Sequence, residues 1–119
     1  MATKKKAAKP VAKKTRAKSA LEQEYVIARC KDAGVHAGYL VSTNEHHTVL
    51  RDVRRIWHWT GAASLSEIAV YGLNPAKSAA SKIGAVEISK RLRDSDICEL
   101  TVCHDAGRTS IEGMPVWRA

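Results

Sequence analysis

The sequence predicts a small α+β domain, with an antiparallel sheet of about five strands and two short helices, assembled as a homo-oligomer. Short alternating or β-branched segments between turn residues predict the strands. Two segments with helix start and stop residues predict the helices. The chain has 119 residues, no phenylalanine and 5% aromatic residues, so its core is small and subunit contacts are expected to supplement it.

Residues 1–22 are expected to form a disordered basic tail, and residues 23–119 the compact domain. The net charge is +8, from 20 basic and 12 acidic residues. Eight basic residues and no acidic ones fall near the start: Lys4, Lys5, Lys6, Lys9, Lys13, Lys14, Arg16 and Lys18. The charges of the remaining chain therefore balance. The tail is interpreted either as a solvated segment that aids solubility or as an arm that binds nucleic-acid phosphates.

Three strands of an antiparallel meander are expected first, at residues 25–31, 35–42 and 47–59. Glycine is unfavourable inside a strand, so Gly38 predicts a bulge or a close approach of two backbones. The third segment is long for a single strand, and we expect it to be bent or interrupted near Arg54.

Each of the two helices has recognisable end residues. Ser64 and Glu67 match a capping box, in which the serine hydroxyl accepts the glutamate amide while the glutamate side chain reaches back. Gly72 is expected to end this helix. Asp105 is expected to cap the second helix, and Gly113 to end it.

The segments between and after the helices are more irregular. Residues 74–81 form a predicted loop of small polar residues, and residues 83–89 a short strand. Residues 91–96 are expected to be a charged turn, and residues 97–103 another strand. The apolar residues 115–117 predict an extended segment after the second helix.

Cysteine usage and hydropathy indicate the cellular setting. The odd number of cysteines (Cys30, Cys98 and Cys103) and the lack of an apolar leader argue against a disulfide framework and a secretory signal. No run of about 18 apolar residues is present, so a membrane is not an expected partner. These features predict the cytoplasm of a bacterium.

The segment from residue 49 to residue 59 carries the most suggestive chemistry. If it is regularly extended, successive side chains alternate between two sides. One side carries Val49, Arg51, Val53, Arg55, Trp57 and Trp59, and the other Leu50, Asp52, Arg54, Ile56 and His58. Guanidinium groups bind phosphates and indoles stack on bases, so the first side is typical of a nucleotide site.

A structural alternative for this segment stays open. The indoles can belong to the core or to a subunit interface, and Arg51 and Arg55 can pair with nearby carboxylates. A bulge near Arg54 would also change which arginine shares a side with the indoles.

Neither a metal site nor a catalytic site is predicted, and no cofactor is expected. Cys98 and Cys103 are five residues apart on a predicted strand and therefore face opposite sides. The chain lacks a glycine-rich phosphate loop and a nucleophile elbow. His104 adjoins Cys103, but sequence neighbours rarely align as base and nucleophile. The protein is therefore predicted not to be an enzyme.

Three segments in the same order resemble a family of small phage and prophage proteins, over about residues 24–118. They are residues 34–39 (GVHAGY), 54–69 (RRIWHWTGAASLSEIA) and 110–117 (SIEGMPVW). The resemblance extends to phage Thoeris anti-defence proteins, homo-oligomers that sequester cyclic ADP-ribose-type signals and in some cases the cyclic oligonucleotides of CBASS immunity. It implies a ligand site between subunits, with candidates Arg54, Arg55, Trp57, Trp59 and Arg108. Residues 76–84 lack the aromatic residue found in these relatives, which removes one expected contact.

The resemblance implies a phage-encoded binding protein that sequesters a cyclic nucleotide immune signal in the host bacterial cytoplasm and thereby blocks anti-phage defence. The alternative is a nucleic-acid-binding or virion-associated phage protein in which the basic tail makes the contact.

Overall fold

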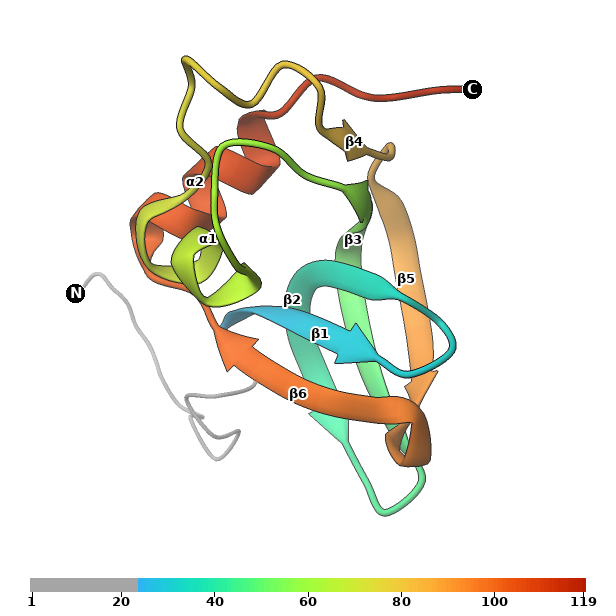
Figure 1. The fold of residues 1–119 in the computed structure, drawn as a ribbon. Coiled ribbons are helices and arrows are strands. Elements are labelled where there is room, and N and C mark those ends of the chain that lie inside the picture. Colours follow the sequence, from blue (N-terminus) through green and yellow to red (C-terminus); the bar gives the residue numbers. More distant parts are fainter. Residues whose placement is uncertain (1–23) are drawn as a thin grey trace, which may run out of the picture.

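The computed structural model describes residues 24–119, so the predicted tail over residues 1–22 lies outside the described residues. Six strands, two α-helices and one 3-10 helix follow in order: β1 (Tyr25–Cys30), β2 (Val35–Thr43), β3 (His47–His58), α1 (Leu65–Tyr71), β4 (Lys82–Ile83), β5 (Glu87–Arg93), the 3-10 helix (Asp94–Asp96), β6 (Ile97–Val102) and α2 (Asp105–Gly113) (Figure 1). The α+β class with an antiparallel sheet is confirmed, with six strands where about five were expected.

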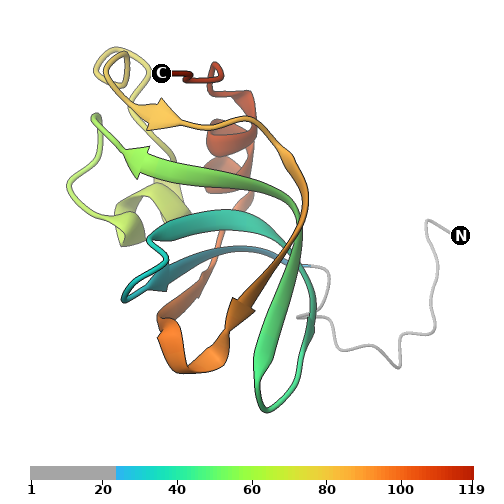
Figure 2. The same cartoon turned by 90° about the vertical axis from the view of Figure 1, so that its right-hand side faces the viewer.

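The sheet is antiparallel throughout and strongly curled. Its strands run in the order β4-β3-β2-β1-β6, and β5 pairs with β3 alongside β4. Figure 2 shows how β5 and β6 approach each other at the 3-10 helix. Two backbone hydrogen bonds tie this helix to the residue after β1 and the residue before β3: Lys31 N–H donates to Asp96 O, and Asp94 N–H donates to His46 O, at 2.7 and 2.8 Å. The curl gives the sheet two separately packed faces.

A hydrophobic core lies on each face of the sheet. The helix-side core, between the sheet and the two helices, contains Tyr25, Ile27, Ala37, Ile56, Ile68, Ala69, Leu73, Ile83 and Ile111. The second core, on the opposite face, contains Val26, Ala28, Cys30, Leu40, Leu50, Val53 and Leu92. In β1 the two sets alternate along the chain, as a strand buried on both faces requires.

The predicted bend in β3 is a bulge at Asp52, whose φ of 51° lies in the left-handed region. Two residues of β3 there face one residue of β2, Gly38. A Cβ atom on Gly38 would lie 2.9 Å from the carbonyl oxygen of Arg51, which confirms the close backbone approach predicted at this glycine. Because of the bulge, Leu50 and Val53 both pack in the second core. Regular alternation therefore does not hold over residues 49–59, and the bulge that the sequence left open is present.

A second irregularity in β3 lies at Trp57. Ile56 pairs with Ile83 and His58 pairs with Lys82, so Trp57 is the extra residue. This bulge lets Trp59 pack against the same helix-side core as Ile56, while Trp57 stays exposed. The two indoles, which a regularly extended segment would place on one side, are thus separated.

Helix α1 begins and ends as its sequence predicts. Ser64 Oγ accepts the amide of Glu67 at 3.2 Å, and the Glu67 side chain accepts the amide of Ala63 at 2.8 Å. Gly72 ends the helix with a φ of 82°, and its amide donates to Ile68 O. Local sequence chemistry accounts for both ends.

Helix α2 starts differently from the prediction. Its N-cap residue is His104, which makes no side-chain capping hydrogen bond, and Asp105 is the first helical residue. The expected capping role of Asp105 is therefore wrong. The His104 amide donates to Ala69 O at 2.8 Å, which fixes the chain as extended up to that residue.

The predicted turn at residues 91–96 is also too long. Strand β5 continues to Arg93 because that residue pairs with His47 at the start of β3, and only Asp94–Asp96 turns. The segment expected as one short strand at residues 83–89 is instead divided between β4 and the start of β5.

Candidate functional site

Arg54 is a buried arginine, 2% exposed, that binds backbone carbonyl groups. Its guanidinium donates to the carbonyl oxygens of Gly84, Ile111 and Met114, each at 2.7 Å. Burial lowers the pKa of Arg54 from its ordinary value. The side chain therefore ties β3 to the segment after β4 and to the C-terminal end of α2, away from solvent.

Two buried or stacked tyrosines lie near Arg54 under α2. The hydroxyl of Tyr25 is buried and has no hydrogen-bond partner within residues 24–119, and burial raises its pKa well above the ordinary value. Its ring meets that of Tyr39 edge-on at 4.9 Å. The Tyr39 hydroxyl donates to Glu112, and the Arg51 guanidinium lies 4.3 Å over the Tyr39 ring.

Arg55 and Trp57 form the exposed pair that the sequence singled out. The Arg55 guanidinium lies 3.9 Å from the centre of the Trp57 ring, and Trp57 is 56% exposed. A Cβ atom on Gly34 would come within 3.1 Å of the Arg55 Nη2, so the β1–β2 turn also confines this side chain. No carboxylate within residues 24–119 forms an ion pair with Arg55. Its N–H groups remain available to an anion.

A buried neutral histidine lies beside Arg55. His36 Nε2 donates to Ala33 O at 2.9 Å, and His36 Nδ1 faces Lys90 Nζ at 3.4 Å. Burial lowers the pKa of His36, and the charges of Lys90 and Arg55 lower it further. Lys90 is partly neutralised by Glu87 at 2.9 Å. The region between β2, β3 and β5 is therefore electropositive, which favours anions.

A second cation–indole pair lies at β4. Lys82 Nζ is 5.4 Å from the centre of the Trp117 ring. The Trp117 amide donates to Ile83 O at 2.9 Å, which places the C-terminal segment along β4. The sequence did not predict this pair. The only signal for it was the predicted extended apolar segment at residues 115–117, which did not indicate the strand that this segment lies against.

The remaining candidates lie apart from Arg55 and Trp57. Trp59 is half-buried against the helix-side core, and its Nε1 donates to Ala62 O at 3.2 Å. Arg108 on α2 pairs with Glu112 at 2.9 Å, and this hydrogen bond raises the pKa of Arg108. Of the five candidates, the structure brings together Arg55 and Trp57, and it places Arg54, Trp59 and Arg108 in other surroundings.

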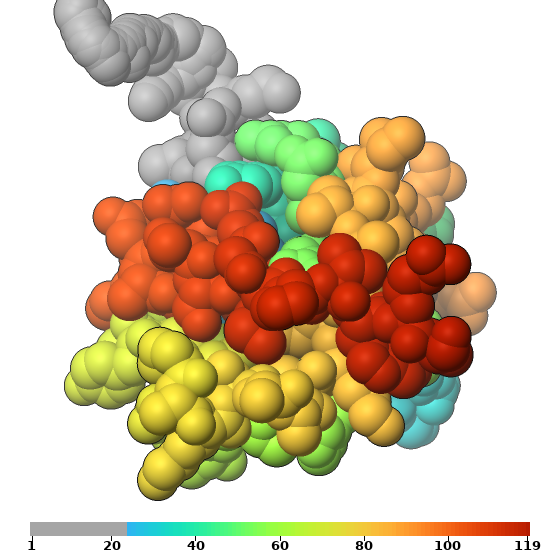
Figure 3. Space-filling view, turned by 90° about the horizontal axis from the view of Figure 1, so that it is seen from above, coloured from blue at the N-terminus to red at the C-terminus, as the bar shows by residue number. Residues whose placement is uncertain are grey.

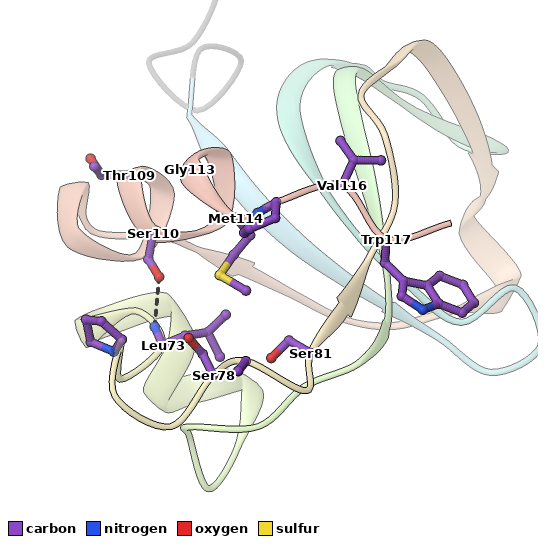
Figure 4. A pocket seen from close by; sticks show the side chains of 12 residues that line it. Leu73, Ser78, Ser81, Thr109, Ser110, Gly113, Met114, Val116 and Trp117 are labelled. Atoms are coloured by element: carbon purple, nitrogen blue, oxygen red, sulfur yellow. Dashed lines mark hydrogen bonds between the residues drawn. The ribbon is translucent and has the colours of Figure 1, made fainter. Parts of the chain in front are cut away.

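A cavity of about 610 Å³ lies between the loop before β4, the end of α2 and the C-terminal segment. Figure 3 shows this face, with the loop and the C-terminal segment side by side. Figure 4 shows Met114 reaching down from the end of α2 toward Leu73 and Ser78. The Leu73 amide donates to Ser110 Oγ at 2.9 Å and joins the loop to α2. Trp117 lies at the far end of the cavity, so the cavity adjoins the Lys82–Trp117 pair.

The thiols and acidic groups of the described chain give little sign of other chemistry. The three cysteines are free, and burial raises the pKa of Cys103 to about 11, which keeps this thiol protonated at neutral pH. Residues 24–119 contain no group of three or more His, Cys, Asp or Glu side chains placed to hold a metal ion. The helices of this part of the chain are too short to cross a membrane.

Comparison with family models identifies the domain. The family described as Domain of unknown function (DUF6948) matches residues 23–111, well over half of the chain. The chain belongs to the DUF6948 family. The matched region of this DUF6948 protein includes Arg54, Arg55, Trp57, Trp59 and Arg108, whereas Trp117 lies beyond it. Comparisons with curated proteins and with solved structures found no match. The expected relation to phage anti-defence proteins remains a prediction.

Proposed function

We propose that this DUF6948 protein is a non-enzymatic binding protein that sequesters a cyclic nucleotide, of the cyclic ADP-ribose type or a cyclic oligonucleotide, and thereby blocks bacterial anti-phage signalling. The observation that carries the proposal is the Arg55–Trp57 pair. Its guanidinium is stacked on an exposed indole and has no carboxylate partner within residues 24–119.

The pair offers two kinds of contact that a nucleotide uses. A base stacked on an aromatic side chain contributes about 1–3 kcal/mol, and a hydrogen bond to a charged group about 1.5–3 kcal/mol. Because Trp57 and the turn at Gly34 already confine the Arg55 side chain, this side chain loses little conformational entropy when its guanidinium binds a ligand. The nearby Lys90 adds positive potential.

The same surroundings support binding without turnover. A neutral His36 that is 1% exposed, with its Nε2 hydrogen-bonded to a backbone carbonyl, is a poor general base for a ligand on the surface. The Cys103 thiol is protonated at neutral pH. We therefore expect the ligand to be released intact.

The test uses the full chain incubated separately with cyclic ADP-ribose isomers and with cyclic dinucleotides and trinucleotides. After gel filtration, retained ligand is released by heat and identified by chromatography. We expect at least one ligand to be retained and recovered unchanged. Failure to retain any of them contradicts the proposal, and recovery of a cleaved ligand contradicts the non-enzymatic part.

A matched pair of variants locates the site. Arg55→Ala and Arg51→Ala each remove a guanidinium stacked on an aromatic ring of the same sheet, but Arg51 lies over Tyr39 and pairs with Asp52. We expect Arg55→Ala to weaken binding about tenfold or more, and Arg51→Ala to leave it within about twofold. Equal loss in both variants would place the ligand elsewhere.

The same protein preparation distinguishes cyclic-nucleotide binding from the alternative function, nucleic-acid binding. Retention of a DNA duplex with a steep dependence of affinity on salt, and no retention of cyclic nucleotides, would favour that function. Sedimentation of the free chain and of the complex tests the predicted homo-oligomer and a site between subunits.

A further inference from the structure

We infer that the cavity beside β4 is a base subsite, which takes the uncharged heterocyclic ring of a nucleotide whose phosphate reaches Lys82. The choice of ligand rests on the proposed function, whereas the cavity, its chemistry and its neighbouring cation are independent features of the fold. The cavity measures about 610 Å³, within the range of about 300–1,000 Å³ typical of small-ligand sites.

The lining of the cavity fits a neutral ring rather than a phosphate. Its walls are largely apolar, with Leu73, Pro75, Met114 and Trp117 among them. None of its twelve lining residues carries a charged side chain. A phosphate placed there would lose its hydration without a cation in return, whereas a flat ring buries its apolar faces.

Of the three serine hydroxyls in the cavity wall, one has no hydrogen-bond partner within residues 24–119. Ser78 is 7% exposed, and no hydrogen bond joins its Oγ to any group within residues 24–119. Two other serine hydroxyls that line the cavity are occupied: Ser110 Oγ accepts the Leu73 amide, and Ser81 Oγ accepts the Thr60 amide, both at 2.9 Å. Figure 4 shows Ser78 beneath Met114, among the side chains that surround the cavity. The Ser78 hydroxyl thus keeps its hydrogen-bonding capacity at the cavity wall, and a ring nitrogen or exocyclic amine would supply a partner for it.

A cation lies beside one of the residues that line the cavity. Trp117 lines the cavity and also lies under Lys82 Nζ, which is 5.4 Å from the centre of its ring. Lys82 follows the lining residue Ser81 in the chain. A ligand with its ring in the cavity can therefore place a phosphate at Lys82, outside the apolar lining. This order of groups, ring then phosphate, is that of a nucleotide.

Two neighbouring alanines provide a matched test by titration calorimetry with adenosine and with ADP. Ala79 and Ala80 are both exposed, but only Ala79 lines the cavity. We expect Ala79→Trp to fill the cavity and weaken both probes about tenfold or more, and Ala80→Trp to leave both within about twofold. Lys82→Ala is expected to weaken ADP and not adenosine.

A second variant separates binding from folding. Because the Ser78 hydroxyl has no partner within residues 24–119, Ser78→Ala should leave the thermal midpoint unchanged or higher while weakening adenosine several-fold. A lower midpoint with unchanged adenosine affinity would overturn the inference, because the hydroxyl would then be structural.

The outcomes of this experiment are distinct from those of the retention test above. Absence of adenosine binding, or equal affinities in Ala79→Trp and Ala80→Trp, overturns the base subsite even if a cyclic nucleotide is retained. Adenosine binding that Ala79→Trp abolishes supports the subsite even if no cyclic nucleotide is retained, in which case the proposed function fails alone.

Discussion

Replacement of Arg54 by leucine tests how the buried guanidinium holds the C-terminal part of the domain. The substitution retains apolar bulk but removes the guanidinium that donates at 2.7 Å to each of the carbonyl groups of Gly84, Ile111 and Met114. Of these three, Ile111 O keeps the Met114 amide as a donor at 3.2 Å. Three hydrogen bonds to a charged group contribute about 4.5–9 kcal/mol. Burial of the cation offsets several kcal/mol, so we expect a net loss of about 3–5 kcal/mol in the free energy of unfolding.

Urea unfolding followed by circular dichroism measures this loss. For a domain of this size the urea midpoint should fall by about 2–3 M. Arg51→Leu is the matched control, because Arg51 lies in the same strand but its side chain is half-exposed and its ion pair is on the surface. That variant should lose less than about 1 kcal/mol.

A local measurement supports the global one. In a variant that stays folded, such as Arg54→Lys, hydrogen exchange should quicken at the Trp117 amide, which bonds to Ile83 O beside the Arg54 contacts. Equal urea midpoints for Arg54→Leu and Arg51→Leu would refute the assigned role of Arg54.

Three further predictions concern stability. Burial lowers the pKa of His36, so its contribution to the free energy of unfolding should be complete above about pH 6.5 and should decrease as the pH falls from that value toward the lowered pKa, because the unfolded chain then binds more protons. Urea midpoints between pH 5 and 7 test this, and an equally steep decrease in His36→Gln would contradict it. A Cβ atom on Gly107 would lie very close to Ala69 O, so Gly107→Ala should lower the free energy of unfolding by about 1–3 kcal/mol in thermal unfolding. Gly113 has open space around it, so Gly113→Ala should be neutral or stabilising, and the reverse order would disprove the close contact between the helices. Ser64→Ala should cost about 1 kcal/mol and Asp105→Ala less than about 0.5 kcal/mol, and equal losses in urea would restore the capping role to Asp105.

Features set by local chemistry were predictable from the sequence. The Ser64 cap and the Gly72 stop depend on residues within one helix, and the close approach at Gly38 follows from the absence of a side chain. The extension of β5 to Arg93 depends instead on pairing with His47, 46 residues earlier. Charge along that segment indicated a turn, and only the distant partner makes it a strand.

The candidate site was predictable in part for the same reason. Arg55 and Trp57 are two residues apart on an extended chain, so their contact follows from local geometry. The burial of Arg54 requires carbonyl groups of α2 and the segment after it, which no local pattern reveals. The left-handed conformation of Asp52 then changed which residues share a face with Arg55.

The pairing of β1 with β6 has a kinetic consequence. These strands are the first and last of the sheet along the described chain, and Ala28 lies opposite Leu100. The long intervening loop must close before this ladder gives any favourable energy, which slows folding. A sheet with such high contact order is expected to form on the order of milliseconds to seconds, with β1 left as an uncovered edge until β6 has been synthesised. During synthesis that edge is open to pairing with another nascent chain, so aggregation is most favoured before translation reaches residue 97.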